Sequence, residues 1–523
     1  MSPFLVRVIL LAVMLLAGAG CANFAITDKF ASRKFPRHYV LVDRDGYPIE
    51  VREKSGEDER TIPYERHLEN IIKGIDDTVK ALIDPDRPAV PCPAGSAAES
   101  SLALSPTRGD APLRLLLFAH GGINSYSDGF RRMKALFSQR RGFLNLYDGQ
   151  NPAPHAAYYP IFINWNSDLL DSIIDEVFLI RDGRRVEWWK AAPSAPFVIL
   201  GRLVGSAFGV PLSLGRRTTN YLTDDTLSQE DIQRDSLSAA LFPLRFLTAP
   251  VVEAFGTPAW QIMKRRAQLA VAGRLRPRED TAREKPAQEG AARTLVETLL
   301  EPVKSCGKVT AWLSKSGLVP VEITLVGHSL GTLLLNRLLA VAGGRLPIDR
   351  IVQLAPASGI DEVEGHVVPY LRLHENAKFW WFSLSRSDEA RESSYFVLPQ
   401  GTLLEWIDTL FERPRTTGQS TSGRADNVSG YYLDGDRTQE AGQAVCGDRF
   451  VSTKDAPLVR DRVVFCVSRR QSDEAPAKHG DFDEPRFLGQ ILCTVDPRAF
   501  TEGFCKWRVN MLQPYTRSLG PLP

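Results

Sequence analysis

The 523-residue sequence lacks three features that would indicate common classes of protein. It contains no Cys-x-x-Cys or His-x-x-x-His spacing, so nothing in it supports a metal site. Its formal net charge is only +2, so nothing indicates a nucleic-acid partner. Its apolar segments are too short, or too interrupted by arginine and proline, to be comfortable membrane spans. With 43% hydrophobic and 24% charged residues, the composition is that of a globular protein with ample material for a large core.

The N-terminus has the anatomy of a secretory signal. Arg7 precedes an apolar run over residues 8–17, and small residues lead from this run to Cys21. Small residues directly before a cysteine resemble the signal of bacterial lipoproteins, in which the cysteine is lipidated and becomes the new N-terminus. Ordinary cleavage near Ala19, or an uncleaved anchor, is the alternative.

This resemblance implies a location for the protein. Residues 1–21 would be the signal peptide with its lipidated cysteine, and residues 22–36 would form a tether. By the same resemblance, Ala22 after Cys21 indicates an outer-membrane lipoprotein. We therefore expect an exported protein of the bacterial cell envelope that faces the periplasm and is held to the membrane by its N-terminal lipid.

Six cysteines remain after Cys21, and an even number in an exported chain permits disulfides. Four of the six lie in the C-terminal part, where we expect the bridges. These four are Cys446, Cys466, Cys493 and Cys505.

Short apolar runs of the kind that is buried in a parallel sheet recur along the chain. A strand, a turn and a second strand are also expected near the start, over residues 38–49. The expected core strands are residues 114–119, 158–165, 350–355, 378–384 and 462–468. The expected helices include residues 64–83, 128–140, 293–316 and 485–492.

The most informative stretch is residues 323–334, which predicts a buried strand, a turn and the start of an apolar helix. The turn, residues 327–331, has the pattern Gly-x-Ser-x-Gly. Its two glycines are needed because a Cβ at either position would collide with neighbouring backbone. The bend lifts the hydroxyl of Ser329 above the sheet edge, where the N–H groups of the helix start also point. We interpret the stretch as a nucleophile elbow rather than a turn that only packs a strand on a helix.

This strand, turn and helix resemble the α/β-hydrolase superfamily, in its lipase and esterase branch. The resemblance covers most of residues 114–492. It implies an α/β fold with a mostly parallel central sheet flanked by helices, built from residues 37–165 and 293–523. A large insertion, residues 166–292, would form a helical cap, and a second insertion, residues 400–461, is polar and rich in glycine.

The large insertion contains two apolar blocks, residues 197–210 and 237–255. In the first block Gly201, Gly205 and Gly209 are four residues apart, so they share a helix face and would allow close contact with another helix. The insertion could be a cap buried on the core. Alternatively, it could be a lid whose apolar face opens toward lipid and lines an acyl pocket.

Residues 120–124, His-Gly-Gly-Ile-Asn, follow an expected core strand. They match the His-Gly turn in which lipases supply one N–H of the oxyanion hole. We assign this donor to Gly122, with Ile123 as the alternative, and the second donor to Leu330. The ring of His120 is expected to brace the loop rather than to act in catalysis.

A serine hydroxyl is a poor nucleophile and needs a base within hydrogen-bond reach. In this superfamily the chain order is serine, acid, histidine. Among the histidines after Ser329, only His479 lies late, on a loop between a strand and a helix. His366 and His374 lie between consecutive core strands, before the expected acid. We therefore assign His479 as the base.

The acid is expected on a loop directly after a strand. Asp388 follows the strand of residues 378–384, where the superfamily most often places it, and Asp361 is the alternative after the preceding strand. Glu389 neighbours Asp388 but has the wrong register. Further candidates in the second insertion are Asp434 and Asp436.

Together these residues predict a serine hydrolase that cleaves carboxylic esters through an acyl-enzyme, and lipid esters are the expected substrates. Ser329 would attack the ester carbonyl, His479 would take its proton, and Gly122 and Leu330 would hold the oxyanion. This chemistry needs neither cofactor nor metal. The alternatives are an acyltransferase with the same triad and a catalytically silent binding protein of the envelope.

Overall fold

The computed structural model describes a little over half of the chain. The described residues are 37–49, 51–55, 58–82, 112–122, 124–138, 158–181, 184–207, 243–273, 289–300, 321–342, 344–384, 389, 402–432, 446–447, 462–468 and 478–500. The expected signal peptide, Cys21 and the tether therefore lie outside the described residues.

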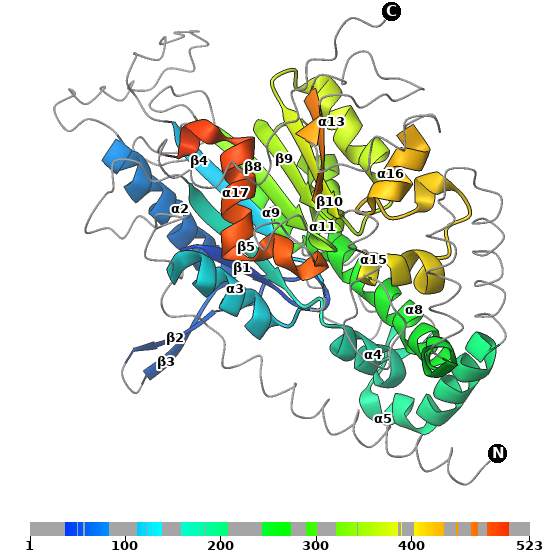
Figure 1. Ribbon diagram of the computed structural model, residues 1–523. Helices are drawn as coiled ribbons and strands as arrows, with labels where there is room; N and C mark the ends of the chain where they lie inside the picture. The colour runs from blue at the N-terminus through cyan, green and yellow to red at the C-terminus, as the bar shows by residue number, and fades with distance from the viewer. Residues whose placement is uncertain are drawn as a thin grey trace, which may run out of the picture.

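An eight-stranded sheet forms the centre of the protein (Figure 1). Its strands, in spatial order, are β1 (Tyr39–Val42), β5 (Tyr159–Trp165), β4 (Leu113–Ala119), β8 (Val321–His328), β9 (Ile348–Leu354), β10 (Lys378–Leu384), β12 (Val463–Ser468) and β11 (Cys446–Gly447). The first seven pair in parallel, and only β11 runs antiparallel to its neighbour β12. The expected α/β architecture with a mostly parallel sheet is confirmed.

The strands β4, β5, β8, β9 and β10 are rich in apolar residues and are buried along nearly their whole length. This pattern requires cover on both faces of the sheet. Near the start, the expected second strand of residues 38–49 is reduced to a single bridge between Val42 and Pro48. Two further hairpins lie outside the sheet: β2 (Val51–Ser55) with β3 (Asp58–Ile62), and β6 (Ile180–Arg181) with β7 (Arg184–Arg185).

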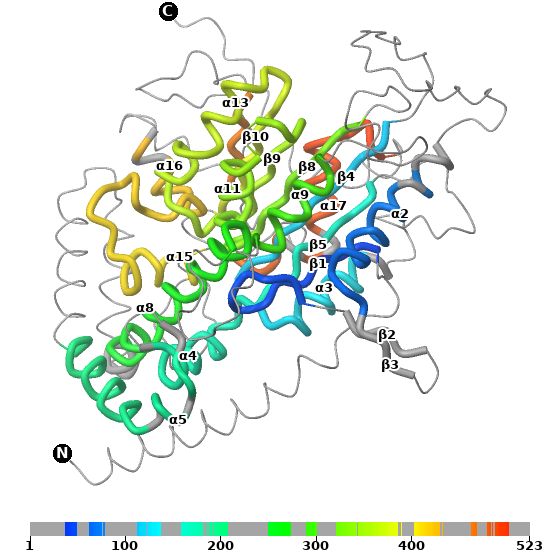
Figure 2. Tube along the Cα trace, turned by 180° about the vertical axis from the view of Figure 1, so that it is seen from behind, coloured from blue at the N-terminus to red at the C-terminus, as the bar shows by residue number. Residues whose placement is uncertain are grey.

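Helices cover both faces of the sheet (Figures 1 and 2). The helices α3 (Tyr126–Ser138) and α17 (Pro485–Val495) pack together on one face. The helices α2 (Tyr64–Leu82), α9 (Ala291–Leu300) and α11 (Gly331–Ala342) pack together on the other. Asp496, at the end of α17, is 1% exposed and lies 3.3 Å from Arg114 and from Arg350 on the strands. These ion pairs fasten the helix that follows His479 to the sheet.

Residues 166–292 supply a group of helices that lies to one side of the central sheet (Figures 1 and 2). They are α4 (Leu169–Phe178), α5 (Trp188–Ala191), a helix over residues 195–207, and α8 (Pro243–Ala272). The long helix α8 contacts α4 at one end of this group and α9 and α11 beside the sheet.

A buried ionic network fastens α8 to α4. Arg266 of α8 is 3% exposed, and its guanidinium lies 2.5 Å from Asp175 and donates to the Ser172 hydroxyl at 3.0 Å. Arg44 contacts the same aspartate at 2.5 Å and Asp171 at 3.3 Å. Since each buried charge has an opposite partner, the network fixes the angle between the two helices.

The helix over residues 195–207 differs from the expectation for its glycines. A Cβ added to Gly201 or to Gly205 would meet no atom within 4 Å. The expected close helix contact is therefore wrong at these two positions, and Gly209 lies outside the described residues.

The second insertion contains more regular structure than its composition indicates. It has α15 (Leu403–Trp406), a π-helical turn η4 (Ile407–Phe411) and α16 (Ala425–Tyr432).

Cys466 and Cys493 are each disulfide-bonded, as expected for the C-terminal part. No helix in the described part of the chain is long and apolar enough to cross a membrane.

Candidate active site

Ser329 lies on the turn between β8 and α11, at the carboxyl edge of the parallel sheet. Its backbone has a φ of +50°, in the left-handed region that non-glycine residues rarely adopt. The flanking glycines allow this bend. A Cβ on Gly331 would lie 2.2 Å from the Ala119 carbonyl oxygen, and one on Gly327 would lie 3.1 Å from the Cα of Thr332. The expected elbow geometry, with a glycine on each side for steric reasons, is present.

Hydrogen bonds hold the strained turn in place. The Ser329 N–H donates to the Leu354 carbonyl at the end of β9, at 2.8 Å. The Ser329 carbonyl accepts from the Ala357 N–H at 3.1 Å and from the Thr332 hydroxyl at 2.6 Å. Strain of this kind persists only where the surroundings fix the backbone, as they do here.

The structure brings His479 to Ser329 across 150 positions of sequence. The Nε2 atom of His479 lies 2.8 Å from the Ser329 Oγ, so the hydroxyl can donate to the ring. Both residues are buried. Burial, and then the positive charge of Arg132, lower the pKa of His479 to about 4. The imidazole is therefore neutral at neutral pH, which is the form that can accept a proton.

A second histidine, which the sequence analysis did not assign, positions the first. His328, directly before the nucleophile, donates from Nε2 to the His479 carbonyl at 2.9 Å. The two rings lie 5.2 Å apart. Burial lowers the pKa of His328 well below its ordinary value, so it too is neutral. Its place inside the Gly-x-Ser-x-Gly pattern is the only signal that could have indicated it.

The expected oxyanion turn packs directly against the elbow. A Cβ on Gly121 would lie 1.9 Å from the His328 carbonyl oxygen and 2.4 Å from the Leu330 nitrogen. Gly122 has a φ of +82°, which glycine adopts without strain. Gly122 and the N–H of Leu330 thus lie on two adjoining turns, as an oxyanion hole requires, whereas Ile123 lies outside the described residues. The need for glycine at position 121 is a finding of the structure.

His120 braces this turn, in agreement with the expectation. Its Nε2 lies 2.9 Å from the Asn164 side-chain oxygen, and its carbonyl accepts from the Trp165 indole at 2.8 Å. Burial lowers the pKa of His120 to about 4. The ring therefore ties β4 to β5 as a neutral group.

The assignment of the acid stays a prediction, because Asp388 lies outside the described residues, as do Asp434 and Asp436. The alternative, Asp361, is exposed, and its carboxylate accepts from the N–H of Glu362 at 2.9 Å within its own helix turn. His366 also faces Glu362, at 3.2 Å, and His374 stacks on Tyr370. None of these three groups is hydrogen-bonded to Ser329 or His479 among the described residues.

Glu389 belongs to a buried ionic cluster that the sequence analysis missed. Arg424 donates from Nε to Glu389 at 3.2 Å and lies 3.3 Å from Asp408 and 2.8 Å from Asp426. Burial raises the pKa of Glu389 well above its ordinary value. The backbone of Arg424 also pairs with Leu384, the last residue of β10. Glu389 is therefore engaged by the arginine and not by the histidine, and no local pattern predicts such a long-range cluster.

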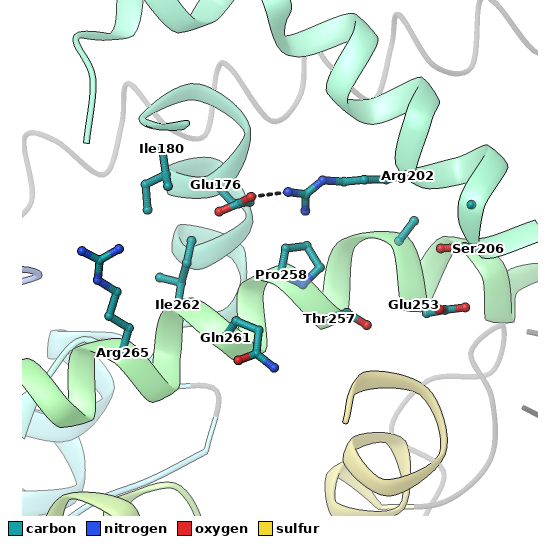
Figure 3. A pocket seen from close by; sticks show the side chains of 12 residues that line it. Glu176, Ile180, Arg202, Ser206, Glu253, Thr257, Pro258, Gln261, Ile262 and Arg265 are labelled. Carbon is teal, nitrogen blue, oxygen red and sulfur yellow. Dashed lines mark hydrogen bonds and ion pairs between the residues drawn. The ribbon is translucent and has the colours of Figure 1, made fainter. Parts of the chain in front are cut away.

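A cavity of about 570 Å³ lies among the helices of residues 166–292, between α4, the helix over residues 195–207 and α8 (Figure 3). The ion pair of Glu176 with Arg202 joins two of its walls. Ile180, Pro258 and Ile262 contribute apolar surface. No residue of the elbow or of the His120–Gly122 turn lines it, so it is separate from the Ser329 site.

The described residues include no group of three or more His, Cys, Asp or Glu side chains placed to hold a metal ion. Comparison with known proteins adds no identification: no family model matches the chain, and neither a curated protein nor a solved structure is significantly similar to it.

Proposed function

We propose that the protein is a serine hydrolase that cleaves carboxylic esters through an acyl-enzyme. The observation that carries this proposal is the 2.8 Å contact between Ser329 Oγ and His479 Nε2. The two atoms come from distant parts of the chain, one from a strained turn and one from the short 3-10 helix His479–Asp483, which follows the seventh parallel strand in the sequence. A packing turn would need neither the strain nor the buried neutral base.

The reaction follows from the positions of these groups. As the Ser329 oxygen forms a bond to the ester carbonyl carbon, its proton passes to His479 Nε2. The carbonyl oxygen becomes negative and is held by N–H groups at Gly122 and Leu330. The bond to the leaving alcohol then breaks, and the imidazolium returns the proton to that alcohol. Water then takes the place of the alcohol. As its oxygen bonds to the acyl carbon, its proton passes to His479, and as the bond to the Ser329 oxygen breaks, the imidazolium returns a proton to that oxygen.

The remaining assignments are part of the same proposal. The sheet would be that of an α/β-hydrolase, with the helices of residues 166–292 as its cap. Asp388 would orient His479, since it comes shortly after β10 in the sequence and β10 ends at the same sheet edge as the elbow. The protein would be an outer-membrane lipoprotein anchored through Cys21, with lipid esters of the envelope as substrates.

Hydrolysis of a panel of p-nitrophenyl esters of graded acyl length tests the activity. We expect turnover by the parent chain and a loss of at least about 10³-fold in Ser329→Ala and in His479→Ala, since removing a triad member removes most of the rate. His366→Ala is the matched control and should retain activity, because this histidine pairs with Glu362 away from the site. Equal turnover by the parent chain and Ser329→Ala would contradict the proposal.

Two further outcomes distinguish the alternatives. If ester cleavage yields mainly a new ester when an alcohol is added to the buffer, the enzyme is an acyltransferase with the same nucleophile. If no ester of the panel is cleaved and a fluorophosphonate does not label the protein, the fold serves as a silent binding protein.

A further inference from the structure

Large exposed apolar side chains are concentrated in one part of the described chain. Seven such residues are more than two fifths exposed, and six of them lie between residues 169 and 251. These six are Leu170, Trp189, Phe197, Leu200, Val204 and Val251. Scattered exposed apolar residues are ordinary, but a concentration on one group of helices indicates a binding surface.

The helix over residues 195–207 carries the centre of this surface. At 100° per residue, Phe197, Leu200 and Val204 lie on one side of it, and their exposed fractions are 76%, 43% and 50%. Gly201 lies between them and has open space above it. Trp189 is 56% exposed on the preceding short helix α5, and we call the exposed residues of these two helices, Trp189, Phe197, Leu200 and Val204, the outer face.

The opposite side of the same helix is already in use. Ala195 and Ile199 are buried with Val177 of α4 in a small apolar cluster. Arg202 on that side pairs with Glu176 and lines the cavity of Figure 3. A surface helix normally turns polar residues away from the side it buries. This helix is apolar on both sides, so the outer face is built to contact something other than water.

We propose that the outer face docks on a phospholipid bilayer and holds the helices of residues 166–292 against the membrane surface. Trp189 lies on α5, and the Nζ of the next residue, Lys190, lies 5.0 Å from the centre of the Trp189 ring. An indole beside an exposed lysine suits the interface of a bilayer, where the ring enters the headgroup layer. The ammonium of Lys190 also pairs with Glu187 at 3.1 Å, so the apolar side chains and the indole carry the contact with lipid.

The start of the chain favours this occupant over others. If Cys21 carries the proposed lipid, residues 22–36 join it to Arg37, where the described chain begins. Fully extended, these 15 residues span at most roughly 54 Å. The folded part would therefore stay close to the membrane, and the outer face would meet lipid far more often than any dilute partner. The docking surface does not depend on the esterase proposal, since none of its residues belongs to the Ser329 site.

Fluorescence quenching by brominated phosphatidylcholine vesicles tests the proposal on the full chain. The contribution of Trp189 is the difference in emission between the parent chain and Trp189→Phe. We expect bromine in the upper acyl chain to quench this contribution at least about twofold. The triple variant Phe197→Ser, Leu200→Ser, Val204→Ser should lose the quenching even when its N-terminal lipid still binds it to the vesicles. Leu373→Ser removes a side chain of 69% exposure outside the outer face and should keep it.

Because the three substituted side chains are exposed, the triple variant should unfold at the temperature of the parent chain, which circular dichroism checks. Equal quenching in the parent chain and the triple variant would overturn the proposal, as would a Trp189 contribution that brominated lipid leaves unchanged. Sedimentation separates the other occupants. A parent dimer that the triple variant converts to a monomer would assign the face to a second copy of the chain. An unquenched monomer would assign it to another segment of the same chain. Loss of esterase activity alone would bear on Ser329 and not on this surface.

Discussion

Gly121→Ala tests whether the turn after β4 and the elbow form one oxyanion hole. In the structure a Cβ at this position would lie 1.9 Å from the His328 carbonyl oxygen and 2.4 Å from the Leu330 nitrogen. Both are backbone atoms, so no side chain can rotate to make room. The added methyl group must push the two turns apart.

The size of the effect follows from these distances. An ordinary contact to a Cβ is about 3.4 Å, so relief requires a movement of about 1 to 1.5 Å between the two turns. A displacement of about 1 Å in a positioned catalytic group costs roughly 10²-fold in rate, and removing one oxyanion donor costs roughly 10²–10³-fold. We therefore expect kcat/KM to fall by about 100-fold, mainly through kcat, which is about 2.7 kcal/mol of lost transition-state stabilisation.

The assay is hydrolysis of a soluble short-chain ester, with circular dichroism to establish that the variant is folded. Gly480→Ala is the matched control. It lies directly after His479, but a Cβ there would meet no atom within 4 Å, so its kcat/KM should stay within about threefold of the parent value. A folded Gly121→Ala protein with undiminished kcat would refute the reasoning, because the two turns would then not need their observed contact.

Three further predictions concern titration and the ionic network. Since the pKa of His479 is lowered to about 4, its ring is still mostly neutral at pH 5.5, where a histidine with its ordinary pKa near 6.5 would be mostly protonated. We therefore expect kcat/KM to keep most of its value at pH 5.5. A pH profile in which kcat/KM is half-maximal at or above pH 6.5 would contradict this. His120 has a folded-state pKa of about 4, so its contribution to stability is present above pH 6.5 and is lost as the pH falls. Between pH 7 and pH 5 the free energy of unfolding, measured in urea, should fall by about 2 kcal/mol less in His120→Gln than in the parent chain. An equal fall in both proteins would exclude this role. Arg266→Met removes the more buried of the two cations that contact Asp175 and leaves Arg44, so it should lower the free energy of unfolding by about 2–3 kcal/mol, less than for a fully unpaired buried charge. Arg131→Met breaks a pair whose arginine is 78% exposed and should change little; equal effects of the two substitutions would show that the buried network is not needed.

The local part of the site could be predicted because its constraints are local. Steric demand fixes Gly327 and Gly331 on either side of the serine, and uninterrupted apolar runs mark the buried parallel strands. His479 could be inferred because few histidines follow Ser329 and only one lies on a late loop. The contact between the two is long-range, and only the assembled sheet brings both to one edge.

Other features depend on contacts that no sequence pattern records. The spacing of Gly201 and Gly205 is the same whether or not a second helix packs on them, and the structure leaves both open. The cluster of Arg424 with Glu389, Asp408 and Asp426 joins three separate segments, and hydrophobic periodicity does not indicate where buried charges will meet. The positioning bond from His328 to the His479 carbonyl likewise requires the folded loop.

Labelling with a fluorophosphonate, followed by mass spectrometry of the digested protein, tests the central claim most directly. We expect one adduct per chain, located on Ser329, and no adduct in His479→Ala over the same time. Absence of labelling in the folded parent chain, or an adduct on a different serine, would contradict it.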